Sequence, residues 1–324
     1  MTARAIGRHG RRAAVGVGRA AVPLLRWGVR RTTGGFVPDI AVPPHAQPLD
    51  LAGRGTTHVL DLSGPAPDAP VLLLMHGIAT TGPLTWFSVL DELRDSYRVV
   101  TFDQRWHGRG IRSENFSLED CADDAAAVLD ALGIGRAVVV GYSMGGASAQ
   151  VMWHRHPERV DGLVLCSTAA RWQGHLGERV FFLMLRALNL GLLSTAATRV
   201  RAHGEMLPPH DPEAVAELRE WCLAELRCTS PWALPVVLNA LGGFDASGYI
   251  GEITVPTGMV ITGNDRAIPT ARQRDLAAVL PDPVVRETPG GHASLVFDLP
   301  HWRPAFLATV HDVVARVTEA QRSA

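Results

Sequence analysis

The chain has 324 residues, 47% of them hydrophobic, so it is long enough for one large α/β domain with an insertion. Its formal net charge of −1 gives no reason to expect nucleic acid or another strongly charged partner. No stretch is long and apolar enough to span a bilayer, and the four cysteines lack the C-x-x-C spacing of a zinc or redox site.

Residues 1–36 differ in composition from the rest, with eight arginines and no acidic residue before Asp39. On a helical wheel all but Arg31 lie on one side, a pattern typical of a helix that binds an anionic membrane surface. Several glycines and Pro23 lower helix propensity, so a disordered tail is an alternative, and packing onto the rest of the chain is another. We expect a cytoplasmic protein, with peripheral membrane contact if the first alternative holds.

After a proline-rich linker that ends at Pro48, short apolar runs alternate with helix-like segments. Val71–Met75 is continuously apolar, as expected of a strand covered on both faces. Alternating strands and helices indicate a parallel sheet with helices on both faces. The predicted strands are 49–51 and 57–62, which form a hairpin, and 71–75, 98–102, 138–140, 160–166, 257–262 and 284–288; the predicted helices are 83–94, 118–132, 144–156, 270–279 and 302–318.

The alternation stops from Arg171 to about Ser247, where only helix-like segments and proline-rich turns occur. We interpret residues 171–247 as a helical cap, residues 49–170 and 248–324 as the α/β core, and 1–48 as an extension with a linker. The cap has more apolar side chains than one helix face needs, which suggests a pocket for an apolar group, although packing onto the core is the simpler reading. These side chains are Trp172, Phe181, Phe182, Met184, Leu185, Leu188, Trp221 and Trp232.

One serine lies between a short β-branched run and a helix-forming run. Val138–Val140 precede Gly141-Tyr142-Ser143-Met144-Gly145, a G-x-S-x-G pattern. Between a strand and a helix this pattern is typical of a nucleophile elbow, which exposes the serine hydroxyl above the sheet. Ser143 is therefore the candidate nucleophile.

A serine hydroxyl is a poor nucleophile at neutral pH, so it needs a base, and the base needs an acid that holds its tautomer. Asp265 follows the predicted strand 257–262, and His292 follows the strand 284–288. In a parallel sheet both would lie at the same edge as Ser143. The chain order Ser143, Asp265, His292 is the order of an α/β-hydrolase triad.

With these residues the sequence resembles the α/β-hydrolase fold superfamily over about residues 49–320. The matching pieces are His76-Gly77, Gly141-Tyr142-Ser143-Met144-Gly145-Gly146, Gly263-Asn264-Asp265 and Gly290-Gly291-His292. The resemblance implies an α/β fold with a mostly parallel eight-stranded sheet and a cap. It also implies an oxyanion hole made by the backbone N–H groups of Ile78 and Met144.

One segment departs from the family pattern. Members usually show Asp-x-Arg-Gly-x-Gly-x-Ser where this chain has Asp103-Gln104-Arg105-Trp106-His107-Gly108-Arg109-Gly110. A tryptophan replaces a glycine, and a glycine replaces the final serine. That segment usually supports the site, so the departure concerns the shape of the pocket more than the triad.

The resemblance favours a hydrolase of small or medium-sized apolar carboxylic esters that needs no metal or organic cofactor. A serine at 143 disfavours haloalkane dehalogenase and epoxide hydrolase activity, because those relatives have aspartate there. Carbon–carbon bond hydrolase, amidase and acyltransferase activities stay open, since they use the same scaffold. A non-catalytic ligand-binding protein is the alternative from another class. The sequence predicts no oligomeric state.

Overall fold

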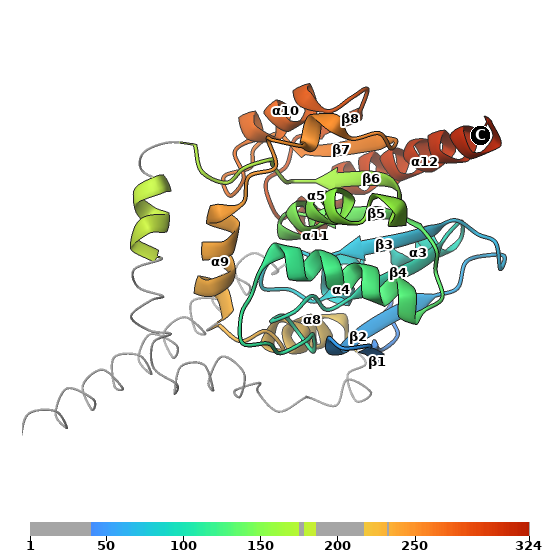
Figure 1. Ribbon diagram of the computed structural model, residues 1–324. Helices are drawn as coiled ribbons and strands as arrows, with labels where there is room; N and C mark the ends of the chain where they lie inside the picture. Colours follow the sequence, from blue (N-terminus) through green and yellow to red (C-terminus); the bar gives the residue numbers. More distant parts are fainter. Residues whose placement is uncertain (1–39, 175–177, 186–216, 232, 324) are drawn as a thin grey trace, which may run out of the picture. The chain divides into compact units, whose positions relative to one another are not determined.

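Eight strands form one sheet in a computed structural model of the chain. The structure describes residues 40–174, 178–185, 217–231 and 233–323. The strands are β1 Gln47–Leu51, β2 Gly55–Leu62, β3 Val71–Met75, β4 Arg98–Phe102, β5 Ala137–Tyr142, β6 Val160–Cys166, β7 Thr257–Thr262 and β8 Val284–Thr288. Their order is β1-β2-β4-β3-β5-β6-β7-β8 (Figure 1). β2 pairs antiparallel with β1 and β4, and all other neighbours are parallel. The predicted mostly parallel sheet is confirmed.

The α-helices and 3-10 helices complete the described elements. They are α2 Gly82–Trp86, α3 Leu90–Arg94, α4 Leu118–Ala131, α5 Met144–Arg155, η1 Pro157–Arg159, α8 Leu218–Arg227, α9 Ala233–Gly243, η3 Ile250–Glu252, α10 Thr270–Val279, α11 Ser294–Phe297 and α12 Leu299–Ser323. A further helical stretch covers 178–185.

Helices cover both faces of the sheet, so the central strands are apolar on both sides. Within β3, Leu73 and Met75 pack in the core cluster that contains α4 and α5, whereas Leu72 and Leu74 pack with α12 on the opposite face. Successive side chains of a strand point to opposite faces, which explains why Val71–Met75 is continuously apolar. In Figure 1, α4 and α5 lie in front of the sheet and α12 lies behind it.

The helix predicted over 83–94 is wrong in one respect, because the structure has two short helices there. α2 ends at Trp86 and α3 begins at Leu90, with a turn between them. The hydroxyl of Ser88, inside that turn, donates to the Leu295 carbonyl, while Trp86 and Val89 are both fully buried. Burial and a contact from a distant segment therefore override local helix propensity.

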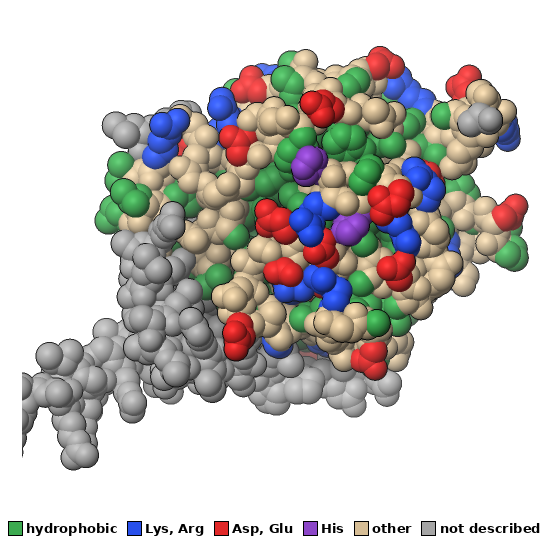
Figure 2. All heavy atoms as spheres, viewed as in Figure 1, with side chains coloured by type: hydrophobic (Ala, Val, Ile, Leu, Met, Phe, Trp, Pro, Cys, Tyr) green, Lys and Arg blue, Asp and Glu red, His purple; other side chains and the backbone are tan. Residues whose placement is uncertain are grey.

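Between β6 and β7, the described residues form helices and one isolated bridge, Arg171 to Asp245. Trp221 of α8 is 2% exposed and packs against Phe87, with ring centroids 5.9 Å apart. Phe181, Leu183 and Met184 are 54%, 67% and 67% exposed, and hydrophobic side chains gather around their helix in Figure 2. Trp221 therefore packs the predicted cap onto the core, which is the simpler of the two interpretations of its apolar side chains. The domain limits stay a prediction, and Leu188 and Trp232 lie outside the described residues.

On the face drawn in Figure 2, acidic and basic side chains alternate over α4 and α5. Arg54 and Arg155, for example, pair with the aspartates of α4. None of the described helices is long and apolar enough to cross a membrane. The arginine-rich residues 1–36 lie outside the described part of the chain, so their membrane, disordered and packed alternatives stay predictions.

The carboxyl ends of the parallel strands lie at one edge of the sheet. β3 ends just before His76, β4 before Asp103, β5 before Ser143 and β6 before Ser167. In open α/β sheets, ligands bind outside this edge. Asp265 lies in the loop after β7 and His292 in the loop after β8, so both are at this same edge.

Candidate active site

Ser143 lies at the tip of a sharp turn between β5 and α5. Its backbone has φ 54° and ψ −116°, which is strained for any residue with a side chain. A Cβ on Gly141 would stand 2.3 Å from the Gly145 carbonyl oxygen, and one on Gly145 would stand 2.1 Å from that of Met75. Only glycine fits at these two positions, so the pattern G-x-S-x-G is a steric requirement of this turn.

The three predicted triad residues lie together. His292 Nε2 is 2.9 Å from Ser143 Oγ, and His292 Nδ1 is 2.8 Å from Asp265 Oδ2. Ser143 is 2% exposed, whereas the His292 side chain is 27% exposed. The Tyr142 hydroxyl donates to the His292 carbonyl, so the residue before the serine also holds the backbone of the histidine.

The Asp265 carboxylate is buried and fully hydrogen-bonded. Oδ1 accepts the backbone N–H groups of Ala267 at 2.8 Å and Ile268 at 2.9 Å. Oδ2 accepts from Thr262 Oγ1 at 2.8 Å and Gln273 Nε2 at 3.0 Å, in addition to His292. Burial alone would raise the pKa of Asp265, but the hydrogen bond and charge of His292, followed by these other donors, lower it below its ordinary value. Asp265 is thus ionised at neutral pH.

Two backbone donors lie beside the serine. Met144 is the first residue of α5, and a Cβ on Gly77, the residue before Ile78, would stand 3.6 Å from Ser143 Cβ. Neither the Ile78 nor the Met144 N–H has a hydrogen-bond acceptor among the described residues. Met144 is fully buried and Ile78 is partly buried, and N–H groups in such places are usually paired, so two unpaired donors beside a serine suit a ligand oxygen.

The orientation of the Ile78 N–H follows from contacts that the sequence did not suggest. The Gly77 carbonyl accepts from His76 Nδ1 at 2.7 Å and from the Thr80 hydroxyl at 2.9 Å. The peptide is trans, so the Ile78 N–H points the opposite way from this carbonyl. We call residues 76–81 the oxyanion loop.

The tautomer of His76 is set by its second ring nitrogen. The backbone N–H of Gln104 donates to Nε2 at 2.8 Å, so Nδ1 has the proton and donates to Gly77. Burial, followed by the neighbouring His107, lowers the pKa of His76 to about 3, so the ring stays neutral. In the sequence, only the dipeptide His76-Gly77 indicated that this loop orients an oxyanion donor. Nothing in the sequence pointed to Thr80 or Gln104.

Asp103, a second buried carboxylate at this edge of the sheet, has no hydrogen bond to His292. Its carboxylate accepts the Gly82 N–H at 2.9 Å and the Arg109 N–H at 2.8 Å. Asp103 thereby joins the segment after β4 to the start of α2. Burial, followed by the charge of Glu225, raises the pKa of Asp103 to about 6.

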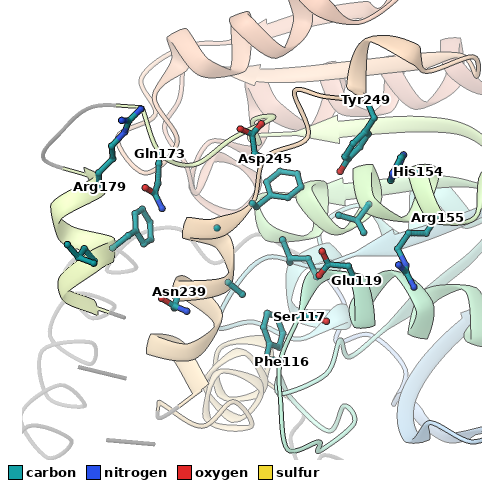
Figure 3. Close-up of a pocket in the computed structure, with 17 residues that line it drawn as sticks. Phe116, Ser117, Glu119, His154, Arg155, Gln173, Arg179, Asn239, Asp245 and Tyr249 are labelled. Carbon is teal, nitrogen blue, oxygen red and sulfur yellow. The ribbon is translucent and has the colours of Figure 1, made fainter. Parts of the chain in front are cut away.

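A separate cavity of about 980 Å³ lies over the far end of α5 (Figure 3). His154 and Arg155 line it together with residues of α4 and α9, and His154 stacks on Tyr249. Ser143 precedes α5 by one residue and His154 is near the helix end, roughly 16 Å away at 1.5 Å per residue. No triad residue is among the described residues that line this cavity.

Comparisons with known proteins agree with this fold. The family model described as alpha/beta hydrolase fold matches residues 70–203. A protein named "Putative carbamate hydrolase RutD" from Caulobacter sp. (strain K31) is 30% identical over 240 residues, 72% of this chain and 87% of that protein. The chain belongs to the α/β-hydrolase fold family. A protein of the same name from Shigella flexneri is 32% identical to this α/β hydrolase over 242 residues, 73% of the chain and 89% of the relative.

Solved structures have the same fold as this α/β hydrolase. A hydrolase from Pseudomonas aeruginosa has a TM-score of 0.65 and 24% identity, covering 83% of this chain and 98% of that one. The enol-lactonase from Burkholderia xenovorans has a TM-score of 0.59 and 23% identity, covering 84% and 100%. At these identities the likeness shows the fold alone.

Proposed function

We propose that this α/β hydrolase cleaves a carboxylic ester through Ser143, His292 and Asp265. The observation that supports it most is the position of His292 between the other two, 2.9 Å from Ser143 Oγ and 2.8 Å from Asp265 Oδ2. Because the ionised Asp265 accepts from Nδ1–H, Nε2 is the unprotonated nitrogen and can take the serine proton.

The reaction follows from these contacts. His292 Nε2 takes the proton as Ser143 Oγ attacks the ester carbonyl, and the carbonyl oxygen becomes an anion that the Ile78 and Met144 N–H groups stabilise. The C–O bond to the alcohol breaks, and the alcohol leaves with the proton from His292. Water, deprotonated by the same nitrogen, then attacks the acyl-enzyme and releases the acid and free Ser143.

The substrate that we propose is a small molecule with an apolar acyl or alcohol group, because the predicted cap has an excess of apolar side chains. A carbamate is the second candidate, since the RutD relatives at 30–32% identity are named as carbamate hydrolases. The same acyl transfer would cleave a carbamate. Carbon–carbon bond, amide and acyl-transfer chemistry remain variations on this site.

A fluorophosphonate probe tests the chemistry without knowledge of the substrate, because only an activated serine reacts. We expect the wild-type protein to be labelled at Ser143 and Ser143→Ala to remain unlabelled. An unlabelled wild type would favour the non-catalytic ligand-binding alternative.

The substrate class is tested with p-nitrophenyl esters of two to sixteen carbons and a p-nitrophenyl carbamate of matched size. An apolar pocket predicts kcat/KM that rises with acyl length before it falls. A flat profile, or one that falls steadily from acetate, would contradict such a pocket. A higher kcat/KM for the carbamate would support the second candidate.

A further inference from the structure

A buried carboxylate of α8 contacts the candidate site from outside the α/β core. Glu225 is 3% exposed and has two hydrogen-bond partners among the described residues, one in each of two different segments. Thr81 Oγ1 donates to its Oε2 at 2.5 Å. Arg109 donates from Nη2 to Oε1 at 2.9 Å and from Nη1 to Oε2 at 3.3 Å. Both partners are hydrogen-bond donors, so the side chain at position 225 must offer two acceptor oxygens.

Thr81 is the last residue of the oxyanion loop. Its hydroxyl also accepts the Leu84 N–H at 3.2 Å and so caps α2. The residue before it, Thr80, holds the Gly77 carbonyl, and that bond orients the Ile78 N–H. Thr81 is joined to the proposed oxyanion donor by two routes: along the chain through three peptide bonds, and through its peptide bond to Thr80 and the hydrogen bond of Thr80 to the Gly77 carbonyl. A displacement of Thr81 therefore reaches the Ile78 N–H.

Arg109 belongs to the segment after β4 that departs from the family pattern. Its backbone N–H donates to Asp103, which also accepts the N–H of Gly82, next to Thr81. The Gly108 N–H in this segment donates to Thr229, just beyond α8, at 3.0 Å. The oxyanion loop, the segment after β4 and α8 thus contact one another pairwise through buried polar groups.

We propose that Glu225 is a positioning residue for the oxyanion loop. Through Thr81 it holds the loop in place, and through Arg109 it fixes the loop and α8 to the segment after β4. The position of α8 against the core then determines how the Ile78 N–H is aligned with Ser143. This inference rests on the proposed function for the role of Ile78 and adds a residue that does not touch the substrate.

The test compares two buried carboxylates that pair with arginines of the same segment. Glu225→Gln leaves one acceptor oxygen, so the new NH₂ faces either Thr81 or Arg109, and both donate. The matched control is Asp124→Asn. Asp124 of α4 is 1% exposed and accepts from Arg105 at 2.7 and 2.8 Å. Among the described residues, its hydrogen-bond partners Arg105 and Arg54 lie outside both α8 and the oxyanion loop.

The readout is phosphonylation of Ser143 by a fluorophosphonate, resolved into binding (KI) and reaction (kinact), at a temperature where circular dichroism shows each variant folded. Glu225→Gln should lower kinact about 10- to 100-fold with KI nearly unchanged, as expected for a misaligned oxyanion donor. Asp124→Asn should change kinact by less than about threefold, because the side chains of Asp124 and Arg105 bond to each other and not to the oxyanion loop. An equal loss in both variants, or an unchanged kinact in Glu225→Gln, would overturn the inference.

A second pair of variants decides the matter if Glu225→Gln does not fold. Thr81→Val removes the hydroxyl that Glu225 accepts and should lower kinact by a similar factor, whereas Thr81→Ser keeps the hydroxyl and should restore it. Equal rates for the two variants would refute the inference. Absence of labelling in the wild type, or labelling that survives Ser143→Ala, would instead refute the proposed function and this inference with it.

Discussion

Asp265→Asn gives the sharpest test of the candidate triad, because five donors of the described residues surround this carboxylate. Oδ1 accepts two backbone N–H groups, from Ala267 and Ile268, that cannot turn away. The amide oxygen of the asparagine must therefore take the Oδ1 position, and its NH₂ must face His292 Nδ1. Two donors would then oppose each other unless the imidazole changes tautomer.

The size of the effect follows from that change. With Nδ1 as acceptor, the proton sits on Nε2 and points at Ser143 Oγ, so His292 cannot act as base in its prevalent form. A wrong tautomer in a serine triad costs about 10⁴-fold in kcat. Gln273 and Thr262 also donate to Oδ2, so we expect a loss of stability of about 1–3 kcal/mol as well.

The assay is kcat on the best p-nitrophenyl ester, with urea denaturation for stability. We expect kcat to fall by about 10³- to 10⁴-fold, with KM changed far less. As pH rises, the variant should recover part of the loss, because hydroxide can deprotonate Ser143 without the imidazole. A kcat within tenfold of the wild type would refute the assignment of Asp265 as the acid.

The remaining predictions concern the other parts of the site and the N-terminus. Ser143→Ala and His292→Ala should each lower kcat by 10⁴-fold or more while circular dichroism stays unchanged, and the double variant should be no worse, because the residues act as a unit. Burial raises the pKa of Asp103 from 3.8 to about 6, so the folded state holds this proton more tightly than the unfolded state. The free energy of unfolding should therefore fall by about 3 kcal/mol as pH rises from about 4 to 6, and Asp103→Asn should lack this component in urea titrations. Trp106→Gly relieves a left-handed φ of 67°, worth about 1 kcal/mol, but removes an indole that is 3% exposed, so a net loss of about 2–4 kcal/mol is expected in the same assay. Deletion of residues 1–36 should leave kcat on soluble esters nearly unchanged, and it should abolish binding to anionic liposomes if that segment is a membrane anchor.

The elements that sequence reasoning predicted are those with a local signal. A continuous apolar run is expected where helices cover both faces of a strand, and the structure has β3 where such a run occurs, at Val71–Met75. The glycines around Ser143 are recognisable because no other residue fits that turn. Residues at the ends of such strands, including Asp265 and His292, could therefore be expected at one edge of the sheet although 149 residues separate Ser143 from His292.

The contacts that sequence reasoning missed have no local signal. The break between α2 and α3 depends on a hydrogen bond from Ser88 to Leu295, which is 207 residues away. Glu225 lies 144 residues from Thr81, on an amphipathic helix where an acidic residue is ordinarily solvent-exposed. Only the three-dimensional arrangement shows that this carboxylate is buried against two donors.

The departure from the family pattern after β4 has a structural explanation in these contacts. Where members usually have glycine, Trp106 adopts a left-handed backbone and packs against Ala233 of α9. Three residues later, Arg109 pairs with Glu225 of α8. A glycine at 106 would offer α9 no apolar surface, and an uncharged residue at 109 would leave a carboxylate buried without a cation, which costs several kcal/mol. The segment that usually supports the site in this family therefore also serves, in this chain, as the surface on which α8 and α9 dock.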